Sequence, residues 1–286
     1  MASLSQPRSA LDLWSSHADD TVVLQTGCTS IDDLLGGGFR SGLLTEVCGE
    51  ASAGKTQLCL QLLLQACLPT AMGGLGGTAC YISTEGIGSI KRLHELAGEY
   101  NERYGEMLRK RRRLEVAQNV NTPISFLDGI FIEQAYEAED LVDVVQTKLP
   151  SLLAERNTKL VVIDSIAAVF RLESTGSVQA ASERSRLMFH LANCMRILSA
   201  QFQVIFVITN QVTGNVVDGE ASFRVDQRQF KPALGLSWSH CINQRLMLHR
   251  SNRSGARRME IIFSPCLPAE STTFQITSAG LTSTEQ

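Results

Sequence analysis

The chain has 286 residues, of which 44% are hydrophobic and 19% are charged, and its formal net charge at pH 7 is −3. This composition excludes a disordered tail, and the weakly acidic balance excludes a strongly basic coat for nucleic acid, so any such binding must come from local patches. No apolar run approaches the roughly 18 residues that a membrane span needs, and no secretory signal is visible, so we expect no contact with a membrane.

The first predicted elements are short. Residues 1–20 are polar and without periodicity, and we interpret them as a flexible lead-in to one core domain over residues 21–286. A short strand at residues 22–24 and a capped helical turn at residues 29–35 come next, and three glycines end that turn. A β-rich strand follows at residues 43–47.

A phosphate-binding motif comes directly after this strand. The pattern G-x-x-x-x-G-K-[ST] is met without a mismatch by Gly49-Glu50-Ala51-Ser52-Ala53-Gly54-Lys55-Thr56. Small residues let successive backbone N–H groups form an anion-binding nest, and the helix that begins at Lys55 adds the positive end of its dipole. Lys55 would reach the β- and γ-phosphates, and the Thr56 hydroxyl would ligate Mg²⁺. The motif predicts nucleoside triphosphate binding; the alternative is a glycine-rich turn that opens a buried helix.

Strands and helices then alternate. The helix from Gln57 to Cys67 is apolar nearly all round apart from a narrow glutamine stripe, which predicts burial between layers, and Pro69 ends it. Further strands are predicted at residues 78–82, 130–132, 160–165 and 204–208, and further helices at 93–113, 137–148 (ended by Pro150) and 187–198. Strands that are apolar on both faces indicate a parallel sheet covered on both sides.

The C-terminal part has a different pattern, with predicted strands but no helices between them. Strands at residues 245–249, 257–263 and 273–277 are separated by turns too short for crossover helices, so we expect them to extend the sheet antiparallel. The eight cysteines are scattered without a Cys-x-x-Cys pair, which argues against a zinc site and suits reduced thiols of the cytosol or nucleus.

Three polar groups at strand ends are expected to meet at the phosphates, because ligands of an open α/β sheet gather at the carboxyl ends of its strands. Asp164 would hold Mg²⁺, or else cap a helix as a strand-terminating acid. Glu85 would orient and deprotonate the attacking water, or else be an exposed loop acid. Gln211 would sense the γ-phosphate at the end of the strand at 204–208.

Four segments together resemble the core of the RecA/Rad recombinases. They are residues 49–56, 81–86, 160–165 and 208–212, and their order and spacing match over about residues 22–281. Ser264-Pro265-Cys266-Leu267-Pro268 resembles the eukaryotic members. Residues 52–58, 162–171 and 232–238 resemble their paralogues in particular. The resemblance implies an α/β fold: a RecA-like P-loop ATPase core with a mostly parallel sheet, helices on both faces and an antiparallel C-terminal extension.

The resemblance also implies roles for single residues. Residues 49–57, through Gln57, would contact ATP, with Lys55 on the phosphates and Thr56 and Asp164 on Mg²⁺. Glu85 matches the water-activating glutamate, and Gln211 matches the sensor. Arg92 falls where the family has an arginine near the nucleotide base, and His240 where some members have a histidine that senses the γ-phosphate.

Two stretches, residues 171–183 and 212–236, correspond to the family's loops that face single-stranded DNA. The first has an acid and no base between residues 172 and 178. The second mixes both signs and carries two phenylalanines that could stack on bases or simply close the loop: Asp218, Glu220, Phe223, Arg224, Asp226, Arg228, Phe230 and Lys231. Neither is the cationic funnel expected of strong single-strand binding.

Other departures concern filament formation. Phe263 stands where relatives often carry an acid that reaches a neighbouring subunit's nucleotide. The lead-in has Pro7-Arg8-Ser9-Ala10 in place of the Phe-x-x-Ala hook that joins protomers, and the relatives' small helical N-terminal domain is not seen. We therefore do not expect this chain to form filaments alone. The run Arg109–Arg113 is open to three interpretations: a solvated helix end, a DNA-backbone contact or a nuclear-import signal.

The resemblance implies an accessory factor in homologous recombination. It would bind ATP and Mg²⁺, hydrolyse ATP weakly with stimulation by DNA, and bind single-stranded or branched DNA in a heterodimer with the C paralogue of the Rad recombinase. It would assist the main Rad recombinase in break repair and fork protection, in the nucleus with a cytoplasmic pool. The alternatives are a self-sufficient strand-exchange recombinase and, more remotely, a hexameric helicase or a small-molecule kinase on the same core.

Overall fold

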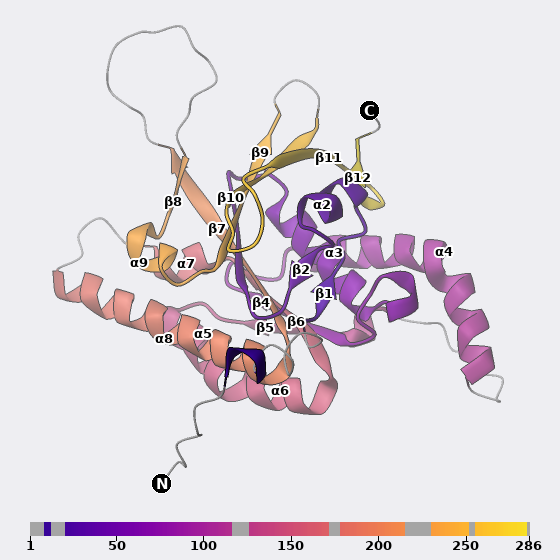
Figure 1. The fold of residues 1–286 in the computed structure, drawn as a ribbon, viewed down its shortest axis with the longest axis horizontal. Helices are drawn as coiled ribbons and strands as arrows, with labels where there is room; N and C mark the ends of the chain where they lie inside the picture. Colours follow the sequence, from indigo (N-terminus) through magenta and orange to yellow (C-terminus); the bar gives the residue numbers. More distant parts are fainter. Residues whose placement is uncertain are drawn as a thin grey trace, which may run out of the picture.

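The alternating strands and helices assemble around a ten-stranded sheet in the computed structural model of the chain (Figure 1). The structure describes residues 9–12, 21–115, 126–171, 178–214, 230–251 and 255–284. The predicted lead-in therefore lies almost wholly outside the described residues.

Nine strands follow one another across the sheet, and β8 (Phe230–Pro232) pairs with β7 off this path. In spatial order they are β12 (Gly280–Ser283), β11 (Ser271–Thr277), β10 (Arg257–Phe263), β9 (Gln244–Arg250), β3 (Leu44–Gly49), β7 (Ile205–Gly214), β6 (Thr158–Asp164), β4 (Thr78–Ser83) and β5 (Ile130–Gln134). All neighbours from β9 to β5 are parallel, as the apolar strands predicted.

The antiparallel extension is confirmed, but it begins one strand later than predicted. Strand β9 pairs parallel with β3, and only β10, β11 and β12 continue antiparallel. Helix α9 (Gly235–Ser239) precedes β9 and returns the chain to the edge from which parallel strands start. The short strand β12 was not predicted.

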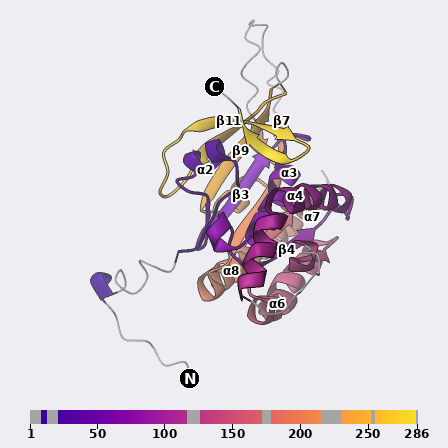
Figure 2. The same cartoon turned by 90° about the vertical axis from the view of Figure 1, so that its right-hand side faces the viewer.

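Helices cover both faces of the sheet (Figures 1 and 2), and one cluster of apolar side chains lies on each face. Helices α2 (Thr29–Leu34), α3 (Lys55–Cys67) and α4 (Ile90–Glu115) cover one face. Helices α5 (Ala138–Asp143), α6 (Leu149–Arg156), α7 (Ile166–Phe170), α8 (Val178–Phe202) and α9 cover the other. In the part of the chain that is described, no helix is long and apolar enough to cross a membrane.

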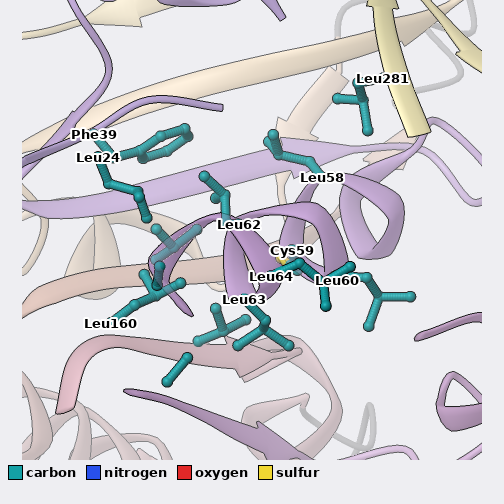
Figure 3. Close-up of a cluster of buried hydrophobic side chains, with 14 of the residues drawn as sticks. Leu24, Phe39, Leu58, Cys59, Leu60, Leu62, Leu63, Leu64, Leu160 and Leu281 are labelled. Atoms are coloured by element: carbon teal, nitrogen blue, oxygen red, sulfur yellow. The ribbon is translucent and has the colours of Figure 1, made fainter. Parts of the chain in front are cut away.

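Helix α3 is the most deeply buried helix, as its sequence predicted. Its leucines point into the core from several sides and meet Leu24, Phe39, Leu160 and Leu281 (Figure 3). The polar stripe is buried too: the Gln61 amide donates to the Thr26 carbonyl at 2.7 Å and accepts from the Leu281 backbone N–H at 2.6 Å. One helix thus joins the first strands, β1 (Val23–Leu24) and β2 (Phe39–Arg40), to the last one.

The predicted helix at 137–148 does not end at Pro150. After α5 the chain makes a π-helical turn, Val144–Lys148, and continues as α6. Pro150 is one of the first two residues of α6, where its missing N–H costs no intrahelical hydrogen bond. A proline that reads as a stop in sequence is therefore the start of the next helical segment.

Two boundaries near the predicted DNA-facing loops also differ. Gln211 lies inside β7, not at its end, because β7 continues to Gly214 and its last residues pair with β8. The stretch 171–183 is not all loop, because α8 begins at Val178. Residues 172–177 and 215–229 are outside the described residues, and with them five of the charges of the second loop and one of its phenylalanines: Asp218, Glu220, Phe223, Arg224, Asp226 and Arg228. Phe230 and Lys231 lie in β8.

Candidate nucleotide-binding site

The phosphate motif forms a turn between the end of β3 and the start of α3. Gly54, at the N-terminus of α3, has φ 109°, and Ser52 has φ 61°. A side chain at Gly49 would place its Cβ 2.8 Å from the Leu248 carbonyl oxygen, so this position has no space for one. The turn therefore needs glycine where the motif has it, and it ends at the N-terminus of α3, where free backbone N–H groups and the helix dipole favour an anion.

Lys55 folds back over this turn. Its ammonium donates to the carbonyls of Gly49 at 2.8 Å and Glu50 at 2.9 Å. Burial lowers the pKa of Lys55, against the opposing effect of the Asp164 carboxylate. A half-buried cation whose partners are two neutral carbonyls would gain from a phosphate.

Asp164 is surrounded by hydroxyl groups at the end of β6. Its Oδ2 accepts from Thr56 at 2.8 Å and from Tyr81 at 2.9 Å, and its Oδ1 accepts from Thr209 at 2.6 Å. The predicted pair of Thr56 and Asp164 is thus in direct contact. Tyr81 and Thr209 were not predicted as partners of this carboxylate, although Thr209 is the first polar residue after the apolar run 204–208, in the strand beside that of Asp164.

Glu85 and Gln211 also meet. Glu85 Oε1 accepts from the Gln211 amide and from the Ser165 hydroxyl, both at 3.0 Å. The Gln211 side-chain oxygen Oε1 in turn accepts from the Arg171 guanidinium, a contact that the sequence did not suggest. The predicted water-activating acid and the predicted sensor therefore form one hydrogen-bonded chain that ends where the first predicted loop begins.

Arg92 lies on the other side of the turn, on α4. Its Nε donates to Gln57 Oε1 at 3.0 Å, and its Nη2 donates to the carbonyls of Thr277 and Ser278 at 2.8 and 2.9 Å. A Cβ on Gly54 would lie 2.7 Å from the Ile276 side chain. The predicted base-side arginine thus lies against the turn between β11 and β12, and β11 reaches the phosphate motif.

His240 is separate from the other predicted residues. It is exposed at the C-terminal end of α9, where its backbone N–H donates to the Leu236 carbonyl. In the described part of the chain its imidazole makes no hydrogen bond to the phosphate motif, Glu85 or Asp164.

The donors present fit a magnesium nucleotide. Mg²⁺ prefers oxygen ligands and is usually held by one or two carboxylates together with substrate phosphates. Thr56 and Asp164 supply such oxygens next to Lys55. Among the residues that are described, no group of three or more His, Cys, Asp or Glu side chains gathers as a metal site of its own.

Comparison with known proteins identifies a family that matches this sequence. The sequence model of the Rad51 family matches residues 17–284. The DNA repair protein XRCC3 homolog of Arabidopsis thaliana is 32% identical, over 90% of this chain and 92% of that protein. The DNA repair protein XRCC3 of Mus musculus is 35% identical, over 97% and 80%. The DNA repair protein RAD51 of Mycosarcoma maydis is 32% identical, over 93% and 71%.

These matches cover nearly the whole domain, and the sheet order and phosphate motif described above agree with the RecA-like fold that the sequence predicted. The chain therefore belongs to the Rad51 family.

Proposed function

We propose that this chain is an ATP-binding paralogue of the Rad recombinase that acts as an accessory factor in homologous recombination. Its relatives include proteins named as DNA repair proteins of the XRCC3 type in a plant and in mammals. The observation that carries the proposal is the contact of Thr56 with Asp164 beside Lys55, because these three residue types are the ones that a magnesium nucleotide requires at a phosphate loop.

Each residue of the site has a separate role in this proposal. Lys55 and the backbone N–H groups of residues 49–56 hold the phosphates, and Thr56 with Asp164 holds Mg²⁺, which offsets phosphate charge when bound. Glu85 orients a water, and Gln211 places the Glu85 carboxylate. Arg92 lies towards the base, with Gln57 beside it. Because Glu85 Oε1 already accepts two hydrogen bonds, we expect slow hydrolysis that DNA stimulates.

The remaining parts of the proposal concern partners. The chain forms a heterodimer with the C paralogue of the Rad recombinase, binds single-stranded or branched DNA, assists the main recombinase and protects forks. It works in the nucleus, with a cytoplasmic pool. Phe263 supports a non-filament role: its ring packs against the Arg245 guanidinium of the same chain, 5.2 Å from the ring centroid, where an acid would reach outward.

The alternative is a self-sufficient recombinase, which the 32–33% identity to RAD51 proteins of a fungus and a plant favours. Negative-stain imaging of the purified chain with ATP and single-stranded DNA distinguishes the two. The accessory role predicts particles without regular filaments, together with a stoichiometric paralogue in material purified from native extract. Long regular filaments of the chain alone would establish the alternative.

A further inference from the structure

A buried carboxylate joins four elements next to the phosphate motif. Glu46 lies on β3 and is fully buried. Its Oε1 accepts from Asn210 Nδ2 of β7 and from Trp238 Nε1 of α9, both at 2.7 Å. Its Oε2 accepts from Arg245 Nε of β9 at 2.5 Å. Three donors from three elements thus converge on one side chain.

Glu46 and its donors are close in sequence to the phosphate motif, to Gln211 and to the second predicted loop. Glu46 is three residues before Gly49, the first residue of the phosphate motif. Asn210 immediately precedes Gln211, whose amide donates to Glu85. Trp238 belongs to α9, which begins within the last residues of the second predicted DNA-facing loop. The Glu46 carboxylate therefore connects the base of the phosphate turn to both ends of the segment 212–236.

The hydrogen bonds of this cluster are costly to break, so its members are expected to move together. A buried charge is strongly destabilising once one of its partners is withdrawn, so α9 and β7 stay bonded to Glu46 in whatever arrangement they adopt. Arg245 also donates to the Ser239 hydroxyl at 3.0 Å, which ties it to the end of α9. A displacement of β3 would therefore reach α9 through directed hydrogen bonds as well as through apolar contacts.

One group in the cluster is not fully satisfied. Asn210 is fully buried, yet its Oδ1 has no hydrogen-bond partner among the described residues. Buried amides of this kind are uncommon and call for an explanation. A second arrangement of the cluster, in which Asn210 gains a donor, would provide one.

We propose that Glu46 is a positioning residue that couples nucleotide binding at residues 49–56 to the arrangement of α9 and Gln211. The proposal rests on the nucleotide binding proposed above. It assigns to the buried cluster the transmission of a change at the phosphate turn from β3 to β7 and α9, through the hydrogen bonds of Glu46 with Asn210 and Trp238.

The chain carries its own reporter for this coupling. It has two tryptophans, so the Trp14→Phe variant leaves Trp238 as the single source of tryptophan fluorescence. The Trp238 N–H bonds directly to Glu46, and indole emission responds to the charge and geometry around it. We would titrate the full-length variant with Mg–ATPγS and record Trp238 emission, with calorimetry on the same samples to measure nucleotide affinity.

The expected result is a change in Trp238 emission that has the same midpoint as the calorimetric titration. Adding Glu46→Gln, which keeps the side-chain shape and removes the charge, should abolish that change. Because coupled sites affect one another by about 5- to 150-fold, nucleotide affinity should also shift by a factor in that range. The matched control is Glu260→Gln, a half-buried acid on β10 that bonds His249 and Arg258, which should leave both readouts unchanged.

A second variant covers the case in which Glu46→Gln fails to fold. Glu46→Leu with Arg245→Met removes both charges of the pair together and leaves no buried charge unpaired. It retains Trp238, and loss of the emission change in this folded variant would support the proposal equally.

The outcomes that overturn it are distinct. Nucleotide binding without any change in Trp238 emission refutes the coupling and leaves the proposed function standing. An emission change that persists undiminished after Glu46→Gln or in the double variant also refutes it. Absence of nucleotide binding by calorimetry refutes the proposed function, and the coupling with it.

Discussion

At the scale of single residues, the two acids of the site differ in the groups that donate hydrogen bonds to them. Glu85 and Asp164 are both acids at the ends of apolar strands. Within the described residues the Asp164 carboxylate accepts from three hydroxyl groups, whereas Glu85 accepts from the Gln211 amide as well as from the Ser165 hydroxyl. Hydroxyl groups can turn towards a metal or a phosphate, and an amide can be displaced by the γ-phosphate. The two acids are therefore suited to different tasks.

The Glu85→Gln variant tests this division. The introduced amide could still hydrogen-bond Ser165, but it could not take a proton from water, and loss of a general base typically costs about 10²- to 10⁴-fold in rate. Nucleotide affinity should stay the same. Steady-state phosphate release and calorimetry measure the two quantities. Glu102→Gln, on the exposed side of α4, is the control, and an unchanged rate in Glu85→Gln would remove Glu85 from the mechanism.

Lys55 gives a pH-dependent prediction for the ligand-free chain. Burial lowers its native pKa below the ordinary value of 10.5, so between those two values the unfolded chain binds more protons than the native one. The free energy of unfolding should therefore rise with pH in that window. Lys55→Met should lack this contribution. Urea unfolding at several pH values from about 8 upward measures the difference, and parallel curves for both proteins would contradict the assignment.

At the scale of elements, α3 shows what periodicity can and cannot predict. Its burial followed from the apolar residues around it, but the tasks of its glutamines did not, because a polar stripe in sequence looks the same whether it faces water or a buried backbone. Gln65, for example, accepts from the Tyr100 hydroxyl at 3.0 Å in the core. Such partners come from segments far away in the chain.

Gln61→Leu should therefore destabilise the protein even though it makes the helix more apolar. The change leaves the Leu281 N–H and the Thr26 carbonyl without a partner, at about 1–3 kcal/mol for each buried group. Thermal and urea unfolding measure the loss. Gln57→Leu, at the start of the same helix, is the comparison variant: it should lower nucleotide affinity, because Gln57 is one of the residues proposed to contact the nucleotide. A Gln61→Leu protein as stable as the parent would mean that α3 does not hold the two chain ends together in this way.

Two glycines on either side of β2, Gly38 and Gly42, allow a matched pair of variants. Gly38 has φ 131°, and an added Cβ would lie 2.1 Å from the Leu24 carbonyl oxygen, whereas Gly42 has φ 80° and open space around it. Gly42→Ala should cost about 1–2 kcal/mol, the cost of a left-handed backbone alone. Gly38→Ala should cost clearly more, because the backbone of β1 must also move. Equal losses in urea unfolding would contradict the close approach of β1 to Gly38.

At the scale of the whole molecule, the sequence predicted the order of elements and the contact of Thr56 with Asp164 well, and the boundaries of elements less well. Thr56 and Asp164 are 108 positions apart and still meet, because both follow strands whose carboxyl ends share one edge of the sheet. Pro150, the parallel pairing of β9 and the length of β7 were misjudged, since each depends on a neighbour that the local sequence does not name. The Glu46 cluster was missed for the same reason, although an acid inside an apolar strand was a visible signal.

The central claim is that residues 49–56 hold the phosphates of a nucleotide. Calorimetric titration of the full chain with Mg–ATP, beside the Lys55→Ala variant, tests it most directly. The account predicts one saturable site in the parent chain and loss of most of the affinity in the variant, because the remaining backbone cradle lacks its cation. Equal dissociation constants for the two proteins, or no binding by the folded parent chain, would contradict it.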